Sequence, residues 1–156
     1  MTTINVNYIN PLLKASVMVI SQACQMTVTI GKPTIKPAAF SDNELLILMG
    51  ITGEMKGQAI LDFSKSSALT VASKMCMMEL PELNDLAQSA ICELCNMIMG
   101  NTATLFSQSG TLIDITPPTV CMGNVSFQNS YAANICVPIL YNGENLFAIN
   151  IAVKED

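Results

Sequence analysis

The chain has no histidine, no arginine and no tryptophan, and only 12% of its 156 residues are charged. Without histidine there can be no Ser–His or Cys–His nucleophile pair and no imidazole ligand for a metal. Without arginine there are no bidentate phosphate clamps, and the net charge of -5 argues against binding to nucleic acid. Any catalytic chemistry must therefore come from carboxylates, amides, hydroxyls, thiols or lysines.

Half of the residues (51%) are hydrophobic, which excludes intrinsic disorder and raises the question of a membrane span. A spanning helix needs about 20 consecutive apolar residues, whereas polar residues or prolines interrupt both long uncharged stretches, 15–31 and 115–143. We also expect no signal peptide, because no charge precedes Lys14 and the start lacks a hydrophobic region. The sequence therefore predicts a cytoplasmic protein that buries its surplus apolar surface in an oligomer.

Six cysteines are present, and Cys92 and Cys95 form a single C-x-x-C pair. A structural zinc site usually needs two such pairs, or one pair plus histidine. A thioredoxin-like pair begins a helix, whereas this pair falls in the middle of a predicted helix. We expect reduced structural thiols and no metal site, and the alternative is a small redox or metal protein that uses Cys92 and Cys95.

Hydrophobic spacing, capping residues and turn residues predict a helix, a hairpin, two helices and then a run of strands. The first helix spans Tyr8 to Met26, with Asn10 as its N-cap and Pro11 at its first position. The later helices are one capped by Ser64 that extends to Met78, and one from Glu82 to about Ser107. The expected strands are 44–52, 57–63, 111–115, 119–122, 132–141 and 146–153, and an Asn142-Gly143 turn joins the last two.

Consecutive strands joined by short turns pair antiparallel, so the sequence predicts one α+β domain over residues 1–156. In this fold the helices pack on one face of an antiparallel sheet. Residues 135–140 are apolar on both faces of their strand, and such a strand needs a second cover. We therefore expect a homodimer, and a sheet with such a strand can extend across the interface.

The long predicted helix carries a narrow polar stripe when its residues are placed about 100° apart. The stripe consists of Glu82, Asp85, Ser89, Glu93, Asn96 and Gly100, and the opposite face carries Ala87, Ile91, Leu94, Ile98 and Leu105. The simplest interpretation is the solvated face of an amphipathic helix. However, the stripe has no lysine to pair with its acids, and soft side chains suited to a partner surface flank it, namely Cys92, Met97 and Met99.

The stretch from Leu86 to Gly100, with the Asn101-Thr102-Ala103 that follows, resembles a signature of the CheC/CheX/FliY family of chemotaxis phosphatases. That signature is S/D-x-x-x-E-x-x-N with a trailing Gly-Asn-x-Ala. Two further stretches are similar to CheX, 10–15 to its N-P-F-I-x-A start and 114–120 to its D-I-x-P-P-x-V stretch. The turn 53–57 resembles the family's G-x-x-x-G hairpin. The first helix lacks E-x-x-N, so the resemblance is to the single-site, dimeric CheX type.

The resemblance implies a CheC-like fold and a phosphatase that acts on the aspartyl-phosphate of a CheY-like response regulator. It assigns Glu93 and Asn96 as the catalytic residues: Asn96 enters the receiver's active site and orients the attacking water, while Glu93 holds a receiver lysine. Ser89 matches the S/D position, and the expected partner contacts are Ser89, Cys92, Met97, Met99 and Gly100. The receiver is expected to bring the phosphoryl group and Mg²⁺, so the chain needs no cofactor of its own.

This mechanism is compatible with the composition, because phosphoryl transfer needs little covalent chemistry from the protein that supplies the water-positioning group. The alternative within the same resemblance is a non-catalytic module of a chemotaxis or motility complex, which docks a receiver or serves as a scaffold through the same helix. Both functions predict binding, and only turnover separates them.

Overall fold

The computed structural model describes residues 6–37, 39–41, 44–126 and 134–153. Its main sheet has eight antiparallel strands, with the path β1-β9-β10-β5-β4-β6, while β2 also pairs with β9 and β7 also pairs with β4. These strands are β1 (Thr29–Ile30), β2 (Thr34–Ile35), β4 (Glu44–Gly53), β5 (Gly57–Ser64), β6 (Ile113–Ile115), β7 (Thr119–Met122), β9 (Ile135–Tyr141) and β10 (Glu144–Val153). A separate ribbon pairs β3 (Ala39–Phe40) with β8 (Val125–Ser126).

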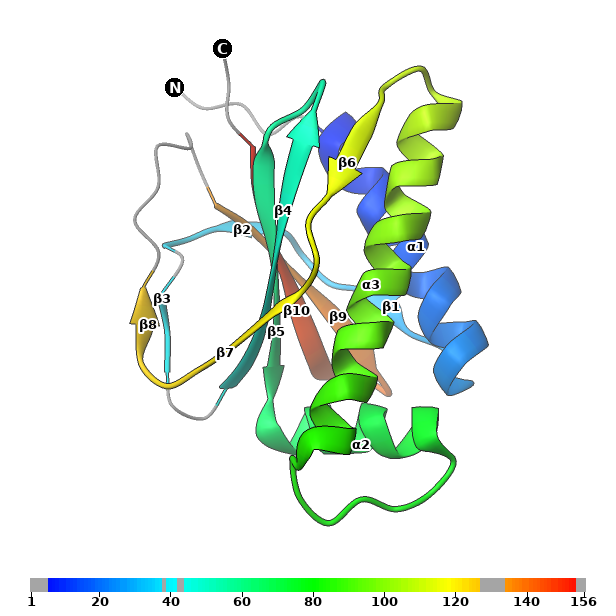
Figure 1. Cartoon of the computed structure of the whole chain (residues 1–156), viewed down its shortest axis with the longest axis vertical. Helices are drawn as coiled ribbons and strands as arrows, with labels where there is room; N and C mark the ends of the chain where they lie inside the picture. Colours follow the sequence, from blue (N-terminus) through cyan, green and yellow to red (C-terminus); the bar gives the residue numbers. More distant parts are fainter. Residues whose placement is uncertain (1–5, 38, 42–43, 127–133, 154–156) are drawn as a thin grey trace.

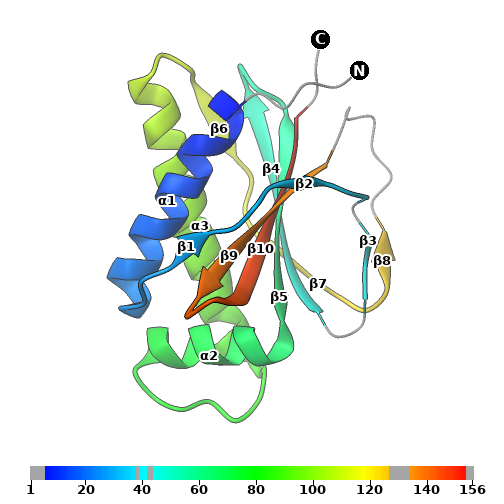
Figure 2. The same cartoon turned by 180° about the vertical axis from the view of Figure 1, so that it is seen from behind.

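Three helices accompany the sheet: α1 (Val6–Cys24), α2 (Lys65–Cys76) and α3 (Asp85–Gln108). Helices α1 and α3 lie on one face of the sheet, α2 lies at one end, and the β3–β8 ribbon lies on the other side (Figures 1 and 2). No helix within the described ranges is long and apolar enough to cross a membrane. The predicted α+β architecture, with an antiparallel sheet and helices on one face, is confirmed.

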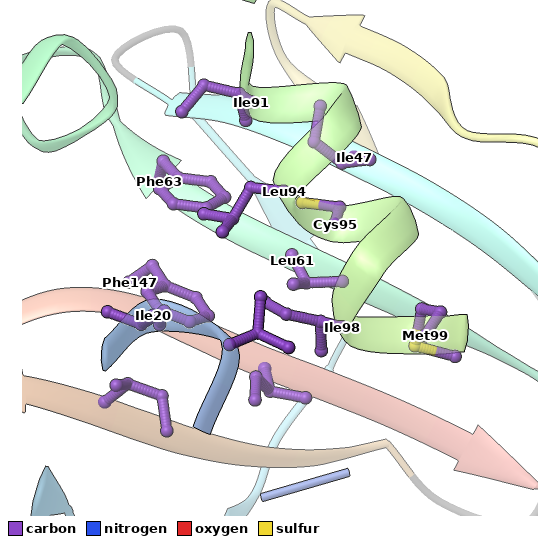
Figure 3. Packing of buried hydrophobic residues seen from close by; sticks show 14 of the residues in the cluster. Ile20, Ile47, Leu61, Phe63, Ile91, Leu94, Cys95, Ile98, Met99 and Phe147 are labelled. Carbon is purple, nitrogen blue, oxygen red and sulfur yellow. The ribbon is translucent and has the colours of Figure 1, made fainter. Parts of the chain in front are cut away.

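The core lies between the sheet and the helices, because alternate residues of each strand point toward α1 and α3. On β4 these are Leu45, Ile47 and Met49, all fully buried. Phe63 of β5 stacks on Phe147 of β10, with ring centroids 4.8 Å apart. The side chains of α3 that face the sheet pack among these residues (Figure 3).

Both predicted hairpins are present, and local sequence explains each of them. Strands β4 and β5 pair from Glu44 opposite Ser64 to Ile51 opposite Gly57. In the β9–β10 turn, Asn142 and Gly143 have φ angles of 53° and 81°, the left-handed conformation that a two-residue hairpin turn requires.

The predicted helix boundaries differ from the observed ones at both long helices. Helix α1 already includes Val6, so Asn10 is not its N-cap and Pro11 lies inside the helix rather than at its first position; Ile9, before both, is buried against the core. Helix α3 begins at Asp85 rather than Glu82, because the Asn84 side chain accepts a hydrogen bond from the Ala87 N–H at 2.9 Å and caps the helix there.

The capping prediction for α2 is confirmed at its start. Ser64 Oγ accepts a hydrogen bond from the Ser67 N–H at 3.1 Å. The helix ends at Cys76, two residues before the predicted end, because Met77 adopts a left-handed conformation with a φ of 55°.

The β3–β8 ribbon was not predicted, and it covers part of the outer face of β4 and β5 rather than of the apolar strand β9. Phe40 of β3 forms a small second core with Leu46 and Ile60, on the face of the sheet away from the helices. Two-residue strands have no periodic sequence signal, so only tertiary contacts reveal them. Extension of the sheet across a dimer remains a prediction.

Candidate functional site

The polar stripe of α3 lies opposite its buried face, as the helical spacing predicts. Ser89, Glu93 and Asn96 are exposed, whereas Ile91 and Leu94 are fully buried against the sheet. Because the core holds one face of α3, the other face is presented to solvent in a defined orientation. The later start of the helix removes Glu82 from the stripe, which therefore extends from Asp85 to Gly100.

The N-terminal half of the stripe forms one wall of an open groove of about 510 Å³. Strand β7, with the residue before it, forms the other wall. The lining residues are Asp85, Gln88, Ser89, Cys92, Glu93, Asn96, Pro118 and Val120. Two segments far apart in the sequence thus meet at the site, and each belongs to a stretch that resembles the chemotaxis phosphatases.

The three signature side chains are free to meet a partner. Within the part of the chain that the structure describes, Ser89, Glu93 and Asn96 make no side-chain hydrogen bond or ion pair with the rest of the protein. Their neighbours differ, because Gln88 Nε2 donates to the Leu83 carbonyl at 2.9 Å and Asn101 Nδ2 donates to the Met97 carbonyl at 2.8 Å. Binding of a partner to these three side chains therefore does not require any of these internal interactions to be broken.

The charge of the groove favours a cationic group. Asp85 and Glu93 both line it, and its lining includes no lysine. A carboxylate without an internal partner can form a charge-assisted hydrogen bond with an ammonium group brought by another protein. The amide of Asn96, one helical turn from Glu93, adds both a donor and an acceptor on the same face.

Gly100 continues the stripe beyond the groove and leaves the helix backbone accessible. It is exposed, and a Cβ atom added there would meet nothing within 4 Å. Packing within the chain therefore does not require glycine at this position. The absence of a side chain instead leaves room for close approach by another molecule.

The structure corrects one of the expected partner contacts. Met99 is fully buried, one turn after Cys95 on the side of α3 that faces the core, so it cannot form a partner surface (Figure 3). Met97 is half-buried, packs against the core and does not line the groove. Cys92 is half-buried and does line the groove.

Three groove residues were not singled out from the sequence, namely Gln88 on α3 and Pro118 and Val120 on the other wall. Pro118 and Val120 come from the 114–120 stretch, whose resemblance to D-I-x-P-P-x-V was the one available signal. Their place beside α3 depends on the pairing of β7 with β4 across the sheet, which spacing in the sequence does not specify.

The cysteines do not form the centre of the site. All six are free, and Cys95 is fully buried. Burial raises the pKa of both the Cys92 and the Cys95 thiol, so both remain protonated at neutral pH. Among the described residues, no group of three or more histidine, cysteine or acidic side chains could hold a metal ion.

Comparison with known proteins gives matches over most of the chain. The family model described as chemotaxis phosphatase CheX matches residues 45–140. CheY-P phosphatase CheX from Thermotoga maritima is 38% identical over 125 residues, which are 80% of this chain and 81% of that protein.

Solved structures of similar fold include a CheX-CheY complex with BeF3 and Mg²⁺ from Borrelia burgdorferi, with a TM-score of 0.82 and 28% identity. That match covers 97% of this chain and 100% of the other. Chemotaxis protein CheX from Vibrio vulnificus has a TM-score of 0.83 and 21% identity, with 95% and 99% of the two chains covered. From the family match and the identity to the Thermotoga protein, the chain belongs to the CheX family of chemotaxis phosphatases.

Proposed function

We propose that this protein is an aspartyl-phosphate phosphatase that removes the phosphoryl group from a CheY-like response regulator in chemotaxis signalling. One observation carries the proposal: Ser89, Glu93 and Asn96 stand together on an exposed face of α3, line a groove and have no internal partner in the described part of the chain. The phosphorylated receiver is the substrate, and we expect the encounter to occur in the cytoplasm.

Asn96 is the residue that we place at the reacting centre. Its side-chain amide would enter the receiver's active site and hold a water molecule in line with the phosphorus atom. Attack by that water breaks the bond between phosphorus and the aspartyl oxygen, and it releases inorganic phosphate and the free carboxylate. The chain forms no covalent intermediate in this scheme, which suits a site without histidine or arginine.

Glu93 would act in capture of the receiver. Its carboxylate, one turn before Asn96, would pair with a lysine of the receiver and align the two proteins. Ser89, one turn further toward the N-terminus, would contact the receiver beside this pair. Mg²⁺ would arrive with the receiver, where it neutralises charge on the phosphoryl oxygens.

The test is to mix the protein with phosphorylated CheY-type receivers and to follow the decay of the aspartyl-phosphate. We expect the decay to accelerate in proportion to the concentration of this protein. Binding to a receiver loaded with BeF3 and Mg²⁺ is measured alongside. Binding without any acceleration of decay would contradict the phosphatase and would favour a receiver-binding module instead.

A further inference from the structure

The apolar wall of the groove is attached to the sheet in an unusual way. Strands β6 and β7 pair with the same strand, β4, and Ile115 lies opposite Ile51 while Thr119 lies opposite Leu48. Three residues, Thr116, Pro117 and Pro118, therefore lie opposite two residues of β4, Met49 and Gly50. Neither proline has an N–H to donate to β4, so the strand departs from regular pairing at this bend, where Pro118 lines the groove.

Thr116 anchors the chain just before this bend. Its N–H donates to the Gly50 carbonyl at 3.0 Å, and its Oγ1 accepts a hydrogen bond from the Gly50 N–H at 2.7 Å. A side-chain hydroxyl thus takes the place of the backbone carbonyl that a regular strand would present. We call this pair of hydrogen bonds the Thr116–Gly50 clip.

Glycine at position 50 is what allows the clip to close. A Cβ added to Gly50 would lie 3.0 Å from Thr116 Cγ2 and 3.2 Å from its Oγ1, tighter than ordinary van der Waals contact. The lack of a side chain at residue 50 therefore leaves the backbone of β4 open to the threonine side chain. The clip holds the bend, and the bend carries Pro118 toward the stripe of α3.

We propose that the β6–β7 bend is a second receiver-contacting wall of the site and that Thr116 is a positioning residue that sets it. This inference rests on the proposed phosphatase function, because it names how the same groove holds its partner. The wall is apolar and uncharged, so it fits an apolar side chain of the receiver next to the cation that Glu93 would bind. The wall contributes to binding of the receiver. The amide of Asn96, on helix α3, acts instead in the chemical step, where it positions the water.

The experiment compares Thr116→Val, Thr116→Ser and Thr52→Val, assayed for dephosphorylation of a CheY-type receiver over a range of receiver concentrations. Valine keeps the shape of threonine but removes the oxygen that Gly50 needs, and serine retains it. Thr52→Val makes the same chemical change at an exposed position of β4 that does not line the groove. We expect Thr116→Val to raise KM about tenfold with kcat within twofold of the original value, and both other variants to leave KM within twofold.

Hydrogen exchange tests the clip itself. The Gly50 amide proton is expected to exchange slowly in the original protein and in Thr116→Ser, and faster in Thr116→Val. Binding of each variant to a receiver loaded with BeF3 and Mg²⁺ should follow the same order as KM. An unchanged KM in Thr116→Val, or an equal rise in Thr116→Ser, overturns the inference while the proposed function stands. A fall in kcat with unchanged KM would also overturn it, and failure of the original protein to bind any receiver would remove both proposals.

Discussion

Asp62 of β5 and Glu44 of β4 form a hydrogen-bonded carboxyl pair on the face of the sheet away from the helices. Burial, the hydrogen bond and the nearby negative charge of Glu44 together raise the pKa of Asp62 to about 8. The pairing lowers the pKa of Glu44. Glu44 Oε2 and Asp62 Oδ1 are buried without any other hydrogen-bond partner in the described part of the chain, which favours a proton held between the two carboxyls.

This pair predicts a decline of stability with rising pH. In the unfolded chain Asp62 ionises near its ordinary pKa of 3.8, whereas the folded protein keeps the proton up to about pH 8. The folded state therefore binds more protons between these values, so the free energy of unfolding falls as pH rises through this window and levels off above it. Asp62→Asn, whose amide can donate to Glu44 at any pH, should flatten the decline.

Urea denaturation at intervals between pH 5 and pH 9 measures this effect. Asp114→Asn, at an exposed position of β6, serves as the matched control and should keep the slope of the original protein. The lowered pKa of Glu44 contributes stability that is lost only at more acidic pH, so it does not affect the same window. Equal slopes for the original protein and Asp62→Asn would contradict the assignment.

Asn96→Ala should abolish catalysis while leaving the fold and much of the docking intact. Asn96 is exposed and has no internal partner in the described part of the chain, so its truncation should change the free energy of unfolding by no more than about 0.5 kcal/mol. Loss of a group used mainly in the transition state should lower the rate by on the order of 10²-fold or more.

Glu93→Ala provides the contrast, because part of its defect should appear as weaker binding and part as a lower rate. Receiver dephosphorylation is followed against the concentration of each variant, and circular dichroism checks folding. A folded Asn96→Ala protein that dephosphorylates at the original rate would exclude this face of α3 as the active site.

Gly100→Ala should stabilise the protein and impair its function. Alanine is favoured over glycine inside a helix by about 0.5–1 kcal/mol, and the added Cβ meets nothing within the chain. If the receiver approaches the helix backbone here, the same methyl group should weaken binding to a BeF3-loaded receiver. Thermal unfolding and receiver titration measure the two effects separately, and a gain in stability with unchanged binding would place Gly100 outside the interface.

The six thiols are expected to be unbridged, and the protein is expected to contain no metal as isolated. Thiol titration under denaturing conditions should count six groups, and metal analysis should find no stoichiometric zinc. Cys95→Ser should destabilise the fold by about 1–3 kcal/mol, because it places a hydroxyl among apolar side chains, and Cys92→Ser at the half-buried groove should cost less. Stoichiometric zinc that disappears when both cysteines are replaced would contradict this prediction.

We expect a homodimer at micromolar concentration, measurable by sedimentation or light scattering. We expect the interface at the edge of the sheet, because Ile30 on β1 and Ile35 on β2 are 45% and 55% exposed beside β9. An exposed apolar edge of this kind favours pairing with a second copy. Replacing both isoleucines by lysine should shift the protein to monomer, and a stable monomer of the original protein would contradict the prediction.

The sequence by itself determined those features that depend on neighbours a few residues apart. Helical spacing was sufficient to place Ser89, Glu93 and Asn96 on one face and Ile91 and Leu94 on the other. The Asn142-Gly143 turn was equally predictable, because its left-handed backbone angles suit those two residues.

Tertiary structure alone decided what covers each surface. Met99 was expected to contact a partner, yet it lies in the core. Helix α3 buries a wider face against the sheet than its hydrophobic spacing indicates. The two-residue strands β3 and β8 have no pattern of their own and exist through their pairing with each other. Pro118 reaches the groove because β4 pairs with residues more than 60 positions away, and such long-range register is set by the packing of the whole sheet.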